Sequence, residues 1–501
     1  MESPSRMSLP APVSRFAHRV KGVLKRTPLR PLVPMVGRGL RLTKRAAIIG
    51  ARKALRFAKL AKGKLVRLTR LGLKKAHNAY YFVARLFVHQ LFRGVFEDDI
   101  AAWKPDVVHT HDGMSLALGA SLGKRLGVKT VFDSHELEAH RNPPLGKIQR
   151  WNVERIEKTG LRQMTAVTTV GHAIADHLRD RYNIARPEVL YNAPPMTPRP
   201  LPEKWQQPGR GNIREEADVP DSAVLLVYTG NLTMNRGLEQ TLDGMAEYFA
   251  TQSDPRDVHL SMVGKARPET RDAVNALAVK HKLEDRIHFH EPVSPTSVVD
   301  FIGNADIAII PVIPAALSYE YAMPNKLFES MLAGLPILGA RLFEMSRFIE
   351  ENDLGVCYDP HSATELAAGL ADLLSDDARF AEQAERMKQR APEFSWEAQE
   401  AKLLNIYDTF GYGETKGRVA MVVPNPCNPD FRVVKQAEAL AAAGHTVRLY
   451  CTRPSKSDLP DTEVINDVEY KRLDWAVRPA ADNFVRFSIR RMKARFGKSA
   501  A

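Results

Sequence analysis

The feature that most constrains the fold of this chain is a series of short, mainly apolar runs, each followed by a turn and then by a helical pattern. Apolar runs of this kind predict strands that are buried on both faces, as in parallel sheets covered by helices. They are Val107 to Thr110, Val128 to Phe132, Leu225 to Tyr228, Leu260 to Val263, Arg418 to Val423 and His445 to Cys451. The alternation predicts an α/β fold with doubly wound sheets, which bind ligands beyond the carboxyl ends of their strands.

The run Pro324 to Pro336 predicts a short helix with a sharply defined start and stop. Proline suits the first helical position because its missing amide would have no partner there, and Gly334 followed by a proline ends the helix. The unpaired amides at the start, near Asn325 and Lys326, and the helix dipole favour an anion such as a diphosphate. The sequence therefore indicates an anion-binding site at the start of this helix.

Lys326 and Glu329 lie three residues apart and therefore share one face of this helix. A cation and a hydrogen-bond acceptor on one face can divide the binding of a nucleotide, with Lys326 contacting phosphate and Glu329 contacting ribose hydroxyls. The alternative interpretation is an ordinary surface ion pair, worth roughly a few tenths of a kcal/mol.

A series of individually weak motifs follows the alternating pattern along the chain. They are Asp106 to Asp112, Phe132 to Glu136, Val167 to Gly171, Val189 to Asn192, Val227 to Gly230, Met262 to Gly264, Ala305 to Pro311, and Pro324 to Pro336. Through these motifs, most of residues 100 to 475 resembles the family-4 glycosyltransferases. The resemblance implies the GT-B fold, in which two Rossmann-like domains face a central cleft. It also implies transfer of a hexose from a nucleoside diphosphate sugar to a hydroxyl acceptor, with retention at the anomeric carbon and without a metal or other cofactor.

The resemblance assigns roles to several residues around the sugar donor. It places His135 near the donor sugar, where a histidine can hydrogen bond to a hydroxyl. In the loop that begins at Gly230, the family has a lysine that neutralises the donor diphosphate. Arg236 occupies its position and preserves the positive charge. Asn231 stands where the family has an arginine, so one positive charge is missing. Lys265, directly after a predicted strand, is the expected replacement.

A second departure concerns two glutamates that the family places eight residues apart around the donor. Glu329 matches the second of them, but Tyr321 occupies the position of the first, and Glu320 lies one residue further away. We expect Glu320 to reach the sugar only if its loop is rearranged. Pro324 and Asn325 complete the predicted donor site. The resemblance implies no dedicated nucleophile, because the leaving phosphate helps to deprotonate the acceptor.

A zinc site is a competing interpretation of the histidines that follow the first two predicted strands. His109, His111, Asp112 and His135 are ligand types that suit zinc. The resemblance implies catalysis without a metal, and we therefore expect none here. A further alternative is that His135 only stabilises its own loop.

The order of the segments departs from that of the family. A doubly wound domain should open with a strand, a turn and a helix, but residues 1–100 contain no such pattern. It appears at the other end, where a strand at 418–423 and a helix at 431–443 precede strands at 445–451 and 464–473. In the family this block opens the protein. We expect a circular permutation, because an incomplete sheet would expose an apolar edge. The alternatives are a truncated second copy and a domain-swapped dimer.

The predicted organisation of the chain has five parts. They are a basic amphipathic arm at 1–75, an acceptor-side Rossmann-like domain made of 76–200 with 417–475, a nucleotide-sugar-binding Rossmann-like domain at 201–394, a crossing helix at 395–410 and a basic tail at 476–501. The linker after the crossing helix is rich in glycine and can span about 24 Å at roughly 3.4 Å per residue. The C-terminal strands can therefore return to the first domain.

The net charge of +14 originates in the arm. Residues 1–75 hold 21 Lys and Arg and a single acidic residue, Glu2, whereas the remaining residues hold 51 basic and 57 acidic side chains. Apolar residues recur at helical spacing between Ile48 and Leu68, with basic residues between them. We expect this amphipathic helix to bind an anionic membrane surface. The alternatives are a solvated tail and nucleic acid, which we do not expect because the arm has few aromatic residues for base stacking.

The remaining composition favours a cytoplasmic enzyme that is peripheral on the inner face of the cell membrane. No apolar run approaches the roughly 20 residues of a membrane-spanning helix, and the start lacks the apolar core of a signal peptide. Cys357, Cys427 and Cys451 are widely spaced, which is typical of reduced packing residues. The expected partners are a nucleoside diphosphate sugar and a lipid-linked or saccharide acceptor.

Two other function classes stay open at this point. A sugar-nucleotide epimerase uses the same fold but needs acid and base carboxylates in the cleft. A catalytically degenerate, nucleotide-binding homologue is suggested by Asn231 and Tyr321, the two departures from the family pattern.

Overall fold

The computed structural model of the chain describes residues 87–206, 209–454 and 457–475. All of them belong to one compact unit, residues 78–501. The predicted amphipathic arm at 1–75 and the basic tail at 476–501 lie outside the described residues. No helix among the described residues is long and apolar enough to cross a membrane.

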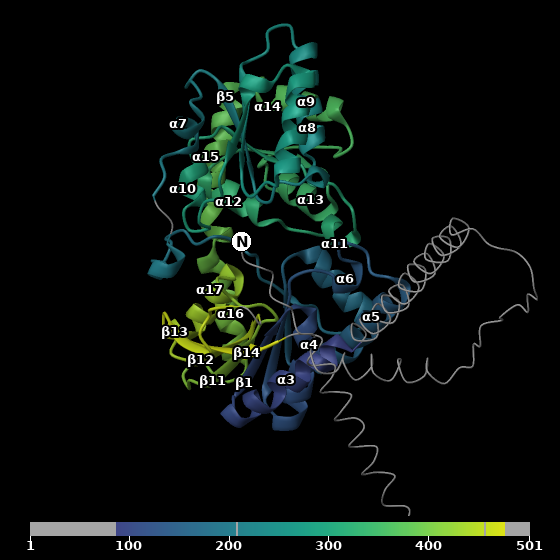
Figure 1. The fold of residues 1–501 in the computed structure, drawn as a ribbon, viewed down its shortest axis with the longest axis vertical. Coiled ribbons are helices and arrows are strands. Elements are labelled where there is room, and N and C mark those ends of the chain that lie inside the picture. Colours follow the sequence, from purple (N-terminus) through teal and green to yellow (C-terminus); the bar gives the residue numbers. More distant parts are fainter. Residues whose placement is uncertain (1–86, 207–208, 455–456, 476–501) are drawn as a thin grey trace, which may run out of the picture. The chain divides into compact units, whose positions relative to one another are not determined.

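The first sheet has eight strands in the order β13-β14-β12-β11-β1-β2-β3-β4. Figure 1 shows β11 to β14, from the end of the sequence, in the same part of the molecule as β1. The strands are β1 Val107–His111, β2 Lys129–Ser134, β3 Ala166–Thr169, β4 Glu188–Val189, β11 Arg418–Val422, β12 Thr446–Arg453, β13 Thr462–Ile465 and β14 Val468–Asp474. All neighbouring pairs are parallel except β13 with β14. The sheet therefore combines strands from two distant parts of the sequence.

The central pair of this sheet joins the two parts. β1 and β11 are parallel, and their register runs from Val107 opposite Val419 to Thr110 opposite Val422. At the start of the pair, the Asp106 amide donates to the Arg418 carbonyl at 2.8 Å, and the Arg418 amide donates to the Asp106 carboxylate at 2.7 Å. The predicted joining of the C-terminal strands to the first domain is thus observed. Circular permutation is a statement about the order of segments in relatives, and it stays a prediction.

Successive residues of β1 and β11 point to opposite faces of the sheet, as strand geometry requires. On one face Val107, Val419 and Met421 pack with buried side chains of α16 and α17. On the other face Val108 and Ala420 pack with those of α3 and α4. The helices of this part of the chain are α3 Val88–Trp103, α4 Asp112–Leu126, α5 Lys147–Leu161, α6 His172–Tyr182, α16 Trp396–Thr409 and α17 Phe431–Ala442, with the 3-10 helices η1 Glu138–His140 and η2 Glu203–Trp205.

One predicted strand is divided in two. The sequence indicated a single strand at 464–473, but the structure has the antiparallel hairpin β13-β14 here. Asn466 and Asp467 connect the strands with φ of 48° and 63°. Two adjacent residues with positive φ form a tight hairpin turn, and Asn and Asp tolerate this conformation better than other non-glycine residues.

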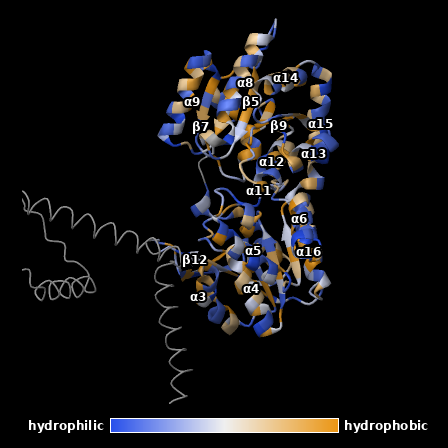
Figure 2. Ribbon diagram, turned by 90° about the vertical axis from the view of Figure 1, so that its right-hand side faces the viewer, coloured by the Kyte–Doolittle hydropathy of each residue, from blue (hydrophilic) through white to orange (hydrophobic). Residues whose placement is uncertain are grey.

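The second sheet is entirely parallel and has the strand order β10-β9-β8-β5-β6-β7. Its strands are β5 Val224–Thr229, β6 Val258–Val263, β7 Ile287–His290, β8 Ile307–Ile310, β9 Ile337–Ala340 and β10 Gly355–Tyr358. Its helices are α7 Ile213–Ala217, α8 Leu238–Thr251, α9 Pro268–His281, α10 Val298–Ile302, α11 Leu317–Glu320, α12 Asn325–Ala333, α13 Phe343–Glu351, α14 Ala363–Leu373 and α15 Asp377–Phe394, with η3 Met234–Arg236 and η4 Glu284–Arg286. The strands are mostly hydrophobic, whereas the covering helices carry hydrophilic residues (Figure 2).

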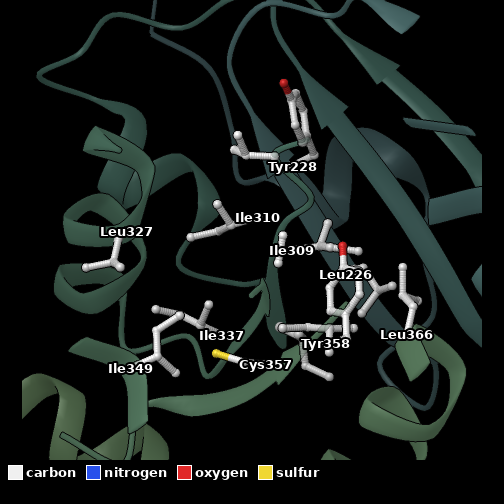
Figure 3. Close-up of a cluster of buried hydrophobic side chains, with 14 of the residues drawn as sticks. Leu226, Tyr228, Ile309, Ile310, Leu327, Ile337, Ile349, Cys357, Tyr358 and Leu366 are labelled. Atoms are coloured by element: carbon white, nitrogen blue, oxygen red, sulfur yellow. The ribbon is translucent and has the colours of Figure 1, made fainter. Parts of the chain in front are cut away.

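The core of this second part gathers side chains of β5, β8, β9 and the helices beside them (Figure 3). Leu226 and Ile309 come from adjacent strands, and Leu327 brings the buried face of α12 into the same cluster. The amphipathic helix α12 is thereby held against the sheet, so that its N-terminus has a defined position. The predicted α/β fold with two doubly wound sheets is confirmed.

The short helix that the sequence predicted within residues 324–336 is α12. The sequence predicted Pro324 as the first helical residue. In the structure the helix begins at Asn325, and Pro324 is the residue that precedes it. Gly334 ends the helix with φ of 73°, and its amide donates to the carbonyl of Met331. This left-handed cap is the conformation for which glycine is favoured.

Substitution of the buried Met421 by alanine should test whether β11 is an integral strand. Met421 is buried between β1 and the helices α16 and α17, so the substitution should lower the free energy of unfolding by about 2 to 5 kcal/mol. Urea denaturation followed by circular dichroism measures this change. Val464→Ala on β13 is the control, because Val464 is 70% exposed. Equal stability of the two variants would contradict the assignment.

Candidate functional site

A cavity of about 930 Å³, here called the main cavity, lies at the carboxyl ends of β5 and β6 and at the start of α12. Residues from several separate regions of the chain line it. They include His135 and Glu136 after β2, Thr229, Gly230, Asn231, Arg236, Gly264 and Lys265 after β5 and β6, Pro324, Asn325, Lys326 and Glu329 around the start of α12, and Pro429 and Arg432 at the start of α17. Nine of the ten predicted site residues are therefore brought together.

The loops after β5 and β6 approach each other closely at this cavity. Gly264 has φ of 152°, and a Cβ atom there would lie 1.8 Å from the carbonyl oxygen of Gly230. Only glycine fits such a close approach of two backbones. The contact positions the loop of Asn231 beside Lys265, and the Leu232 amide donates to the Lys265 carbonyl at 2.9 Å.

Lys326 and Glu329 do not form the surface ion pair that was the alternative interpretation. The ammonium group of Lys326 lies over the ring of Tyr228, 4.0 Å from its centroid. Glu329 accepts a hydrogen bond from the Thr229 hydroxyl at 3.2 Å. Burial lowers the pKa of Lys326 to about 7, and the charge of Arg236 contributes to this effect. A lysine whose charge is disfavoured in this way is stabilised by a bound anion.

The main cavity has an excess of cations without ionic partners. Arg236, Lys265, Lys326 and Arg432 line it, and none of their side chains forms an ion pair within the described part of the chain. The guanidinium of Arg236 only lies over the ring of Tyr319, 5.4 Å from its centroid. By contrast, Arg214 on α7 is paired with Asp306 at 2.5 Å. The arrangement is suited to binding an anion with more than one negative charge.

His135 lies between two carboxylates. Its Nδ1 atom is 2.8 Å from Asp112, and its Nε2 atom is 3.0 Å from Asp133. Burial alone lowers the pKa of His135, and so does the charge of Arg432, but the two carboxylates outweigh them and raise it to about 9. Both ring nitrogens are therefore engaged, and the ring has none free for the sugar hydroxyl that the resemblance implied. His135 is a fixed positive charge in this structure.

Asp133 is the centre of this buried network. One carboxylate oxygen accepts hydrogen bonds from the Gln436 amide at 2.8 Å and from His135, and the other accepts from the Thr168 hydroxyl at 2.8 Å. These partners lie on α17, after β2 and on β3. The network thus links helix α17, near the end of the sequence, to the strands that precede the cavity-lining loop.

The four residues of the alternative zinc interpretation are not brought together as a set. His109 contacts the hydroxyl of Tyr407 at 3.1 Å, and Asp112 contacts His135. His111, Asp133 and His135 are the three residues close enough to share an ion among the described residues. Both ring nitrogens of His135 already contact carboxylates, one on Asp112 and one on Asp133. The donor chemistry of this cluster therefore favours a hydrogen-bonded network.

Glu320 is the one predicted site residue that the structure does not bring to the cavity. Its carboxylate accepts a hydrogen bond from the Phe343 amide at 3.4 Å, at the start of α13. The side chain of the neighbouring Tyr321 contacts the rings of Phe343 and His177. A carboxylate at the N-terminus of a helix is stabilised by the unpaired amides, so Glu320 has a structural role at this position.

Three residues around the cavities carried no predicted role. Burial raises the pKa of Glu136 to about 7, with a further contribution from Glu138. Burial lowers the pKa of Lys435 to about 7, and its ammonium donates to the Ala193 carbonyl at 2.5 Å. Arg432 lies one turn earlier on α17. Arg432 and Lys435 lie on the helix predicted at 431–443, but only the folded chain shows which of them reaches the main cavity.

A second cavity of about 900 Å³, here called the side cavity, adjoins the first. The two share His135, Pro295, Asn325, Glu329, Pro429 and Arg432. Most of the rest of its lining comes from residues 192–201, the start of α16, the loop before α17 with α17 itself, and the segment after β12. It includes many apolar side chains, among them Pro194, Leu201, Trp396, Pro454 and Leu459. The Trp396 amide donates to the Pro194 carbonyl at 3.0 Å, which holds α16 to this segment.

The two mainly parallel sheets, with the charged cavity at their strand ends, have the architecture of the GT-B glycosyltransferases. Residues 32–194 match the model of the glycosyl transferase 4-like domain, and residues 223–376 match that of glycosyl transferases group 1. The chain belongs to this family, the group 1 or family-4 glycosyltransferases, as the motifs predicted.

Curated relatives share about a quarter of their residues with the chain. It is 25% identical over 313 residues to D-inositol 3-phosphate glycosyltransferase of Acidothermus cellulolyticus, covering 60% of this chain and 66% of the relative. The corresponding protein of Corynebacterium aurimucosum is 24% identical over 306 residues, covering 60% of this chain and 71% of the relative.

Solved structures support the fold. Sucrose-phosphate synthase of Thermosynechococcus elongatus superposes with a TM-score of 0.52 and 17% identity, covering 64% of this chain and 77% of the other. HepE of Anabaena, in complex with UDP, gives a TM-score of 0.50 and 15% identity, covering 63% of this chain and 82% of the other.

The charge of His135 can be tested by an NMR titration of its imidazole. We expect a midpoint near pH 9, because Asp112 and Asp133 stabilise the protonated ring. Asp133→Asn should lower the midpoint, since it removes one carboxylate. A charge with a raised pKa stabilises the fold below the unfolded value of about 6.5, and this contribution is lost as the pH rises toward 9. Between about pH 6.5 and pH 9, the free energy of unfolding of His135→Gln should therefore change less with pH than that of the unsubstituted chain. A midpoint below 6.5 in the unsubstituted chain would contradict the assignment.

Proposed function

We propose that this glycosyltransferase moves a hexose from a nucleoside diphosphate sugar to a hydroxyl acceptor, with retention at the anomeric carbon. The observation that carries the proposal is the group of four cations without ionic partners around the start of α12. Such a group suits a diphosphate better than a neutral ligand. The fold neighbour HepE, whose structure is in complex with UDP, adds support for a nucleotide.

In this proposal the diphosphate lies at the amides that open α12, near Asn325. Lys326 and Arg236 neutralise it from two sides. Glu329 accepts a hydrogen bond from a ribose hydroxyl, since its pKa is raised by burial and a hydroxyl donor compensates the buried carboxylate. Gly230, Asn231 and Pro324 line the same site.

The chemistry is the departure of the diphosphate. The bond between the anomeric carbon and the phosphate oxygen breaks, and negative charge develops on that oxygen. The acceptor oxygen forms the new bond on the same face, and its proton goes to the leaving phosphate. Arg236, Lys326 and Arg432 are fixed donors that stabilise the developing charge, which is the kind of interaction that lowers a barrier most. His135 adds a positive charge at the junction of the two cavities.

The side cavity is the proposed acceptor site. It shares His135 and Glu329 with the main cavity, so an acceptor there adjoins the donor sugar. Its lining combines apolar side chains with charged ones, which suits a saccharide or a lipid-linked acceptor. We further propose that residues 1–75 bind the anionic inner face of the cell membrane, on the evidence of their charge.

A sugar-nucleotide epimerase is the second candidate. Glu136 favours it, because a carboxyl group with a pKa of about 7 in the main cavity is suited to acid and base catalysis. Product analysis separates the two reactions: free nucleotide is released by transfer, whereas an isomerised sugar nucleotide is released by epimerisation.

Lys326→Ala and Glu329→Ala should each lower turnover by about 100-fold or more, because each removes a group that contacts the donor. The folding of both variants should be retained, as measured by circular dichroism. Affinity for UDP should fall in Lys326→Ala, and in the unsubstituted chain it should weaken as the pH rises above 7, where Lys326 loses its proton. Isothermal titration measures both effects. Lys280→Ala on the exposed face of α9 is the control. Unchanged binding and turnover would place the donor elsewhere.

Lys265 stays the predicted replacement for the charge that is missing at Asn231, and Arg432, which also lines the main cavity, should supply a second positive charge there. Arg432→Gln should weaken UDP binding by about tenfold, as expected for the loss of one charge-assisted hydrogen bond. Because both side chains line the main cavity, Asn231→Arg should restore binding in the double variant. Arg199→Gln, which changes the side cavity alone, should leave UDP affinity unchanged. If Asn231→Arg does not restore UDP binding in the double variant, Arg432 does not supply a charge that compensates for the one missing at Asn231.

A further inference from the structure

Helix α5 exposes two large apolar side chains. Ile148 is 56% exposed and Trp151 is 62% exposed. Trp103, Trp205 and Trp396 are buried, and Trp475 is only partly exposed, so Trp151 is the most exposed tryptophan among the described residues. An exposed tryptophan beside an exposed isoleucine requires a reason, because neither contributes to the core.

The exposed residues of α5 form one continuous stripe. With about 100° per residue, Lys147, Ile148, Trp151, Arg155 and Lys158 fall within roughly one third of the helix circumference. The opposite side carries the buried residues Asn152, Ile156, Glu157, Gly160 and Leu161. The stripe, here called the α5 face, is therefore the solvent side of a helix whose other side is packed.

The α5 face is positively charged. Lys147, Arg155 and Lys158 are exposed on it, and the guanidinium of Arg155 lies 5.9 Å from the ring centroid of Trp151. Of the acidic residues of the helix, Glu154 lies at the edge of the face and Glu157 on the buried side. Glu154 is paired with Arg181 at 3.1 Å, and Glu157 accepts a hydrogen bond from the buried Tyr182 hydroxyl. No carboxylate of α5 therefore neutralises the three cations of the stripe.

We propose that the α5 face binds the headgroup region of an anionic lipid surface. A tryptophan and an isoleucine enter the boundary between headgroups and acyl chains, where the amphipathic indole ring is favoured. Lys147, Arg155 and Lys158 keep their charges at the level of the phosphates, because long basic side chains can extend along an apolar surface. The combination of apolar and basic residues on one face is complementary to anionic lipid.

The position of α5 in the chain connects this surface to the main cavity. Glu136 lines the cavity, and η1 lies between it and α5. The Leu137 amide donates to the Ser318 hydroxyl at 3.2 Å, which ties this connection to α11 on the other side of the cavity. If the proposed transfer to a lipid-linked acceptor holds, the α5 face brings the cavities to the surface that carries this acceptor. Lipid binding by the face does not itself depend on the reaction.

The test uses the full chain with vesicles of phosphatidylcholine and phosphatidylglycerol whose acyl chains carry bromine. Bromine quenches tryptophan fluorescence only on close approach, so it reports Trp151 and not the arm, which contains no tryptophan. We expect quenching in the unsubstituted chain and its loss in Trp151→Phe, which still sediments with the vesicles. Ile148→Asp should reduce quenching severalfold. Val279→Asp, at an exposed apolar residue of α9, is the matched control and should leave it unchanged.

Three results would overturn the proposal. They are the absence of sedimentation, sedimentation without quenching, which would assign binding to the arm alone, and quenching that persists in Trp151→Phe. No sugar nucleotide is present in the assay. If the unsubstituted chain shows no glycosyl transfer in a separate assay, that result contradicts the proposed function but does not affect the conclusion about lipid binding.

Discussion

The pairing of β1 with β11 is the interaction on which the rest of the structure depends. It joins the segment from 107 to 189 with the segment from 418 to 474 in one parallel sheet. Without it, both central strands would present unpaired amides and carbonyls beside apolar side chains, which is a costly arrangement. The same pairing brings α17 to the cavity, so the energetics of the sheet and the composition of the site have one origin. This pairing places Arg432 in the lining of the main cavity and Gln436 within hydrogen-bond distance of Asp133.

The site is built on electrostatic imbalance. Four cations converge on the main cavity without ionic partners, and burial opposes the charge of one of them, Lys326. Beside them, His135 has the opposite arrangement, since two carboxylates hold its proton. An unpaired cation is ready to receive an anionic ligand, whereas a paired one is a fixed part of the framework. This difference separates the residues proposed to bind the diphosphate from the histidine that adds charge beside them.

Much of the fold and part of the site could be predicted from the sequence. Most strand runs, the bounds of α12 to within one residue and the grouping of Lys326, Arg236 and Asn231 depend on local patterns, and the structure has them close to where they were expected. The predicted contact of His135 depended on free ring nitrogens, which Asp112 and Asp133 occupy. Glu320 lies one residue away from the position that the family pattern gives to the first glutamate. Its carboxylate therefore contacts the start of α13 and not the cavity.

The sequence by itself determined the alternation of strands and helices, the family and the position of the helix start at which the anion site is proposed. These properties depend on the polarity and spacing of neighbouring residues, which the linear order contains. Only the tertiary structure decided that Arg432 shares a cavity with Asn231, that His135 is charged, and that Trp151 faces solvent. Each of these depends on contacts between segments far apart in the sequence, and a local pattern contains no information about which distant side chain will be its neighbour.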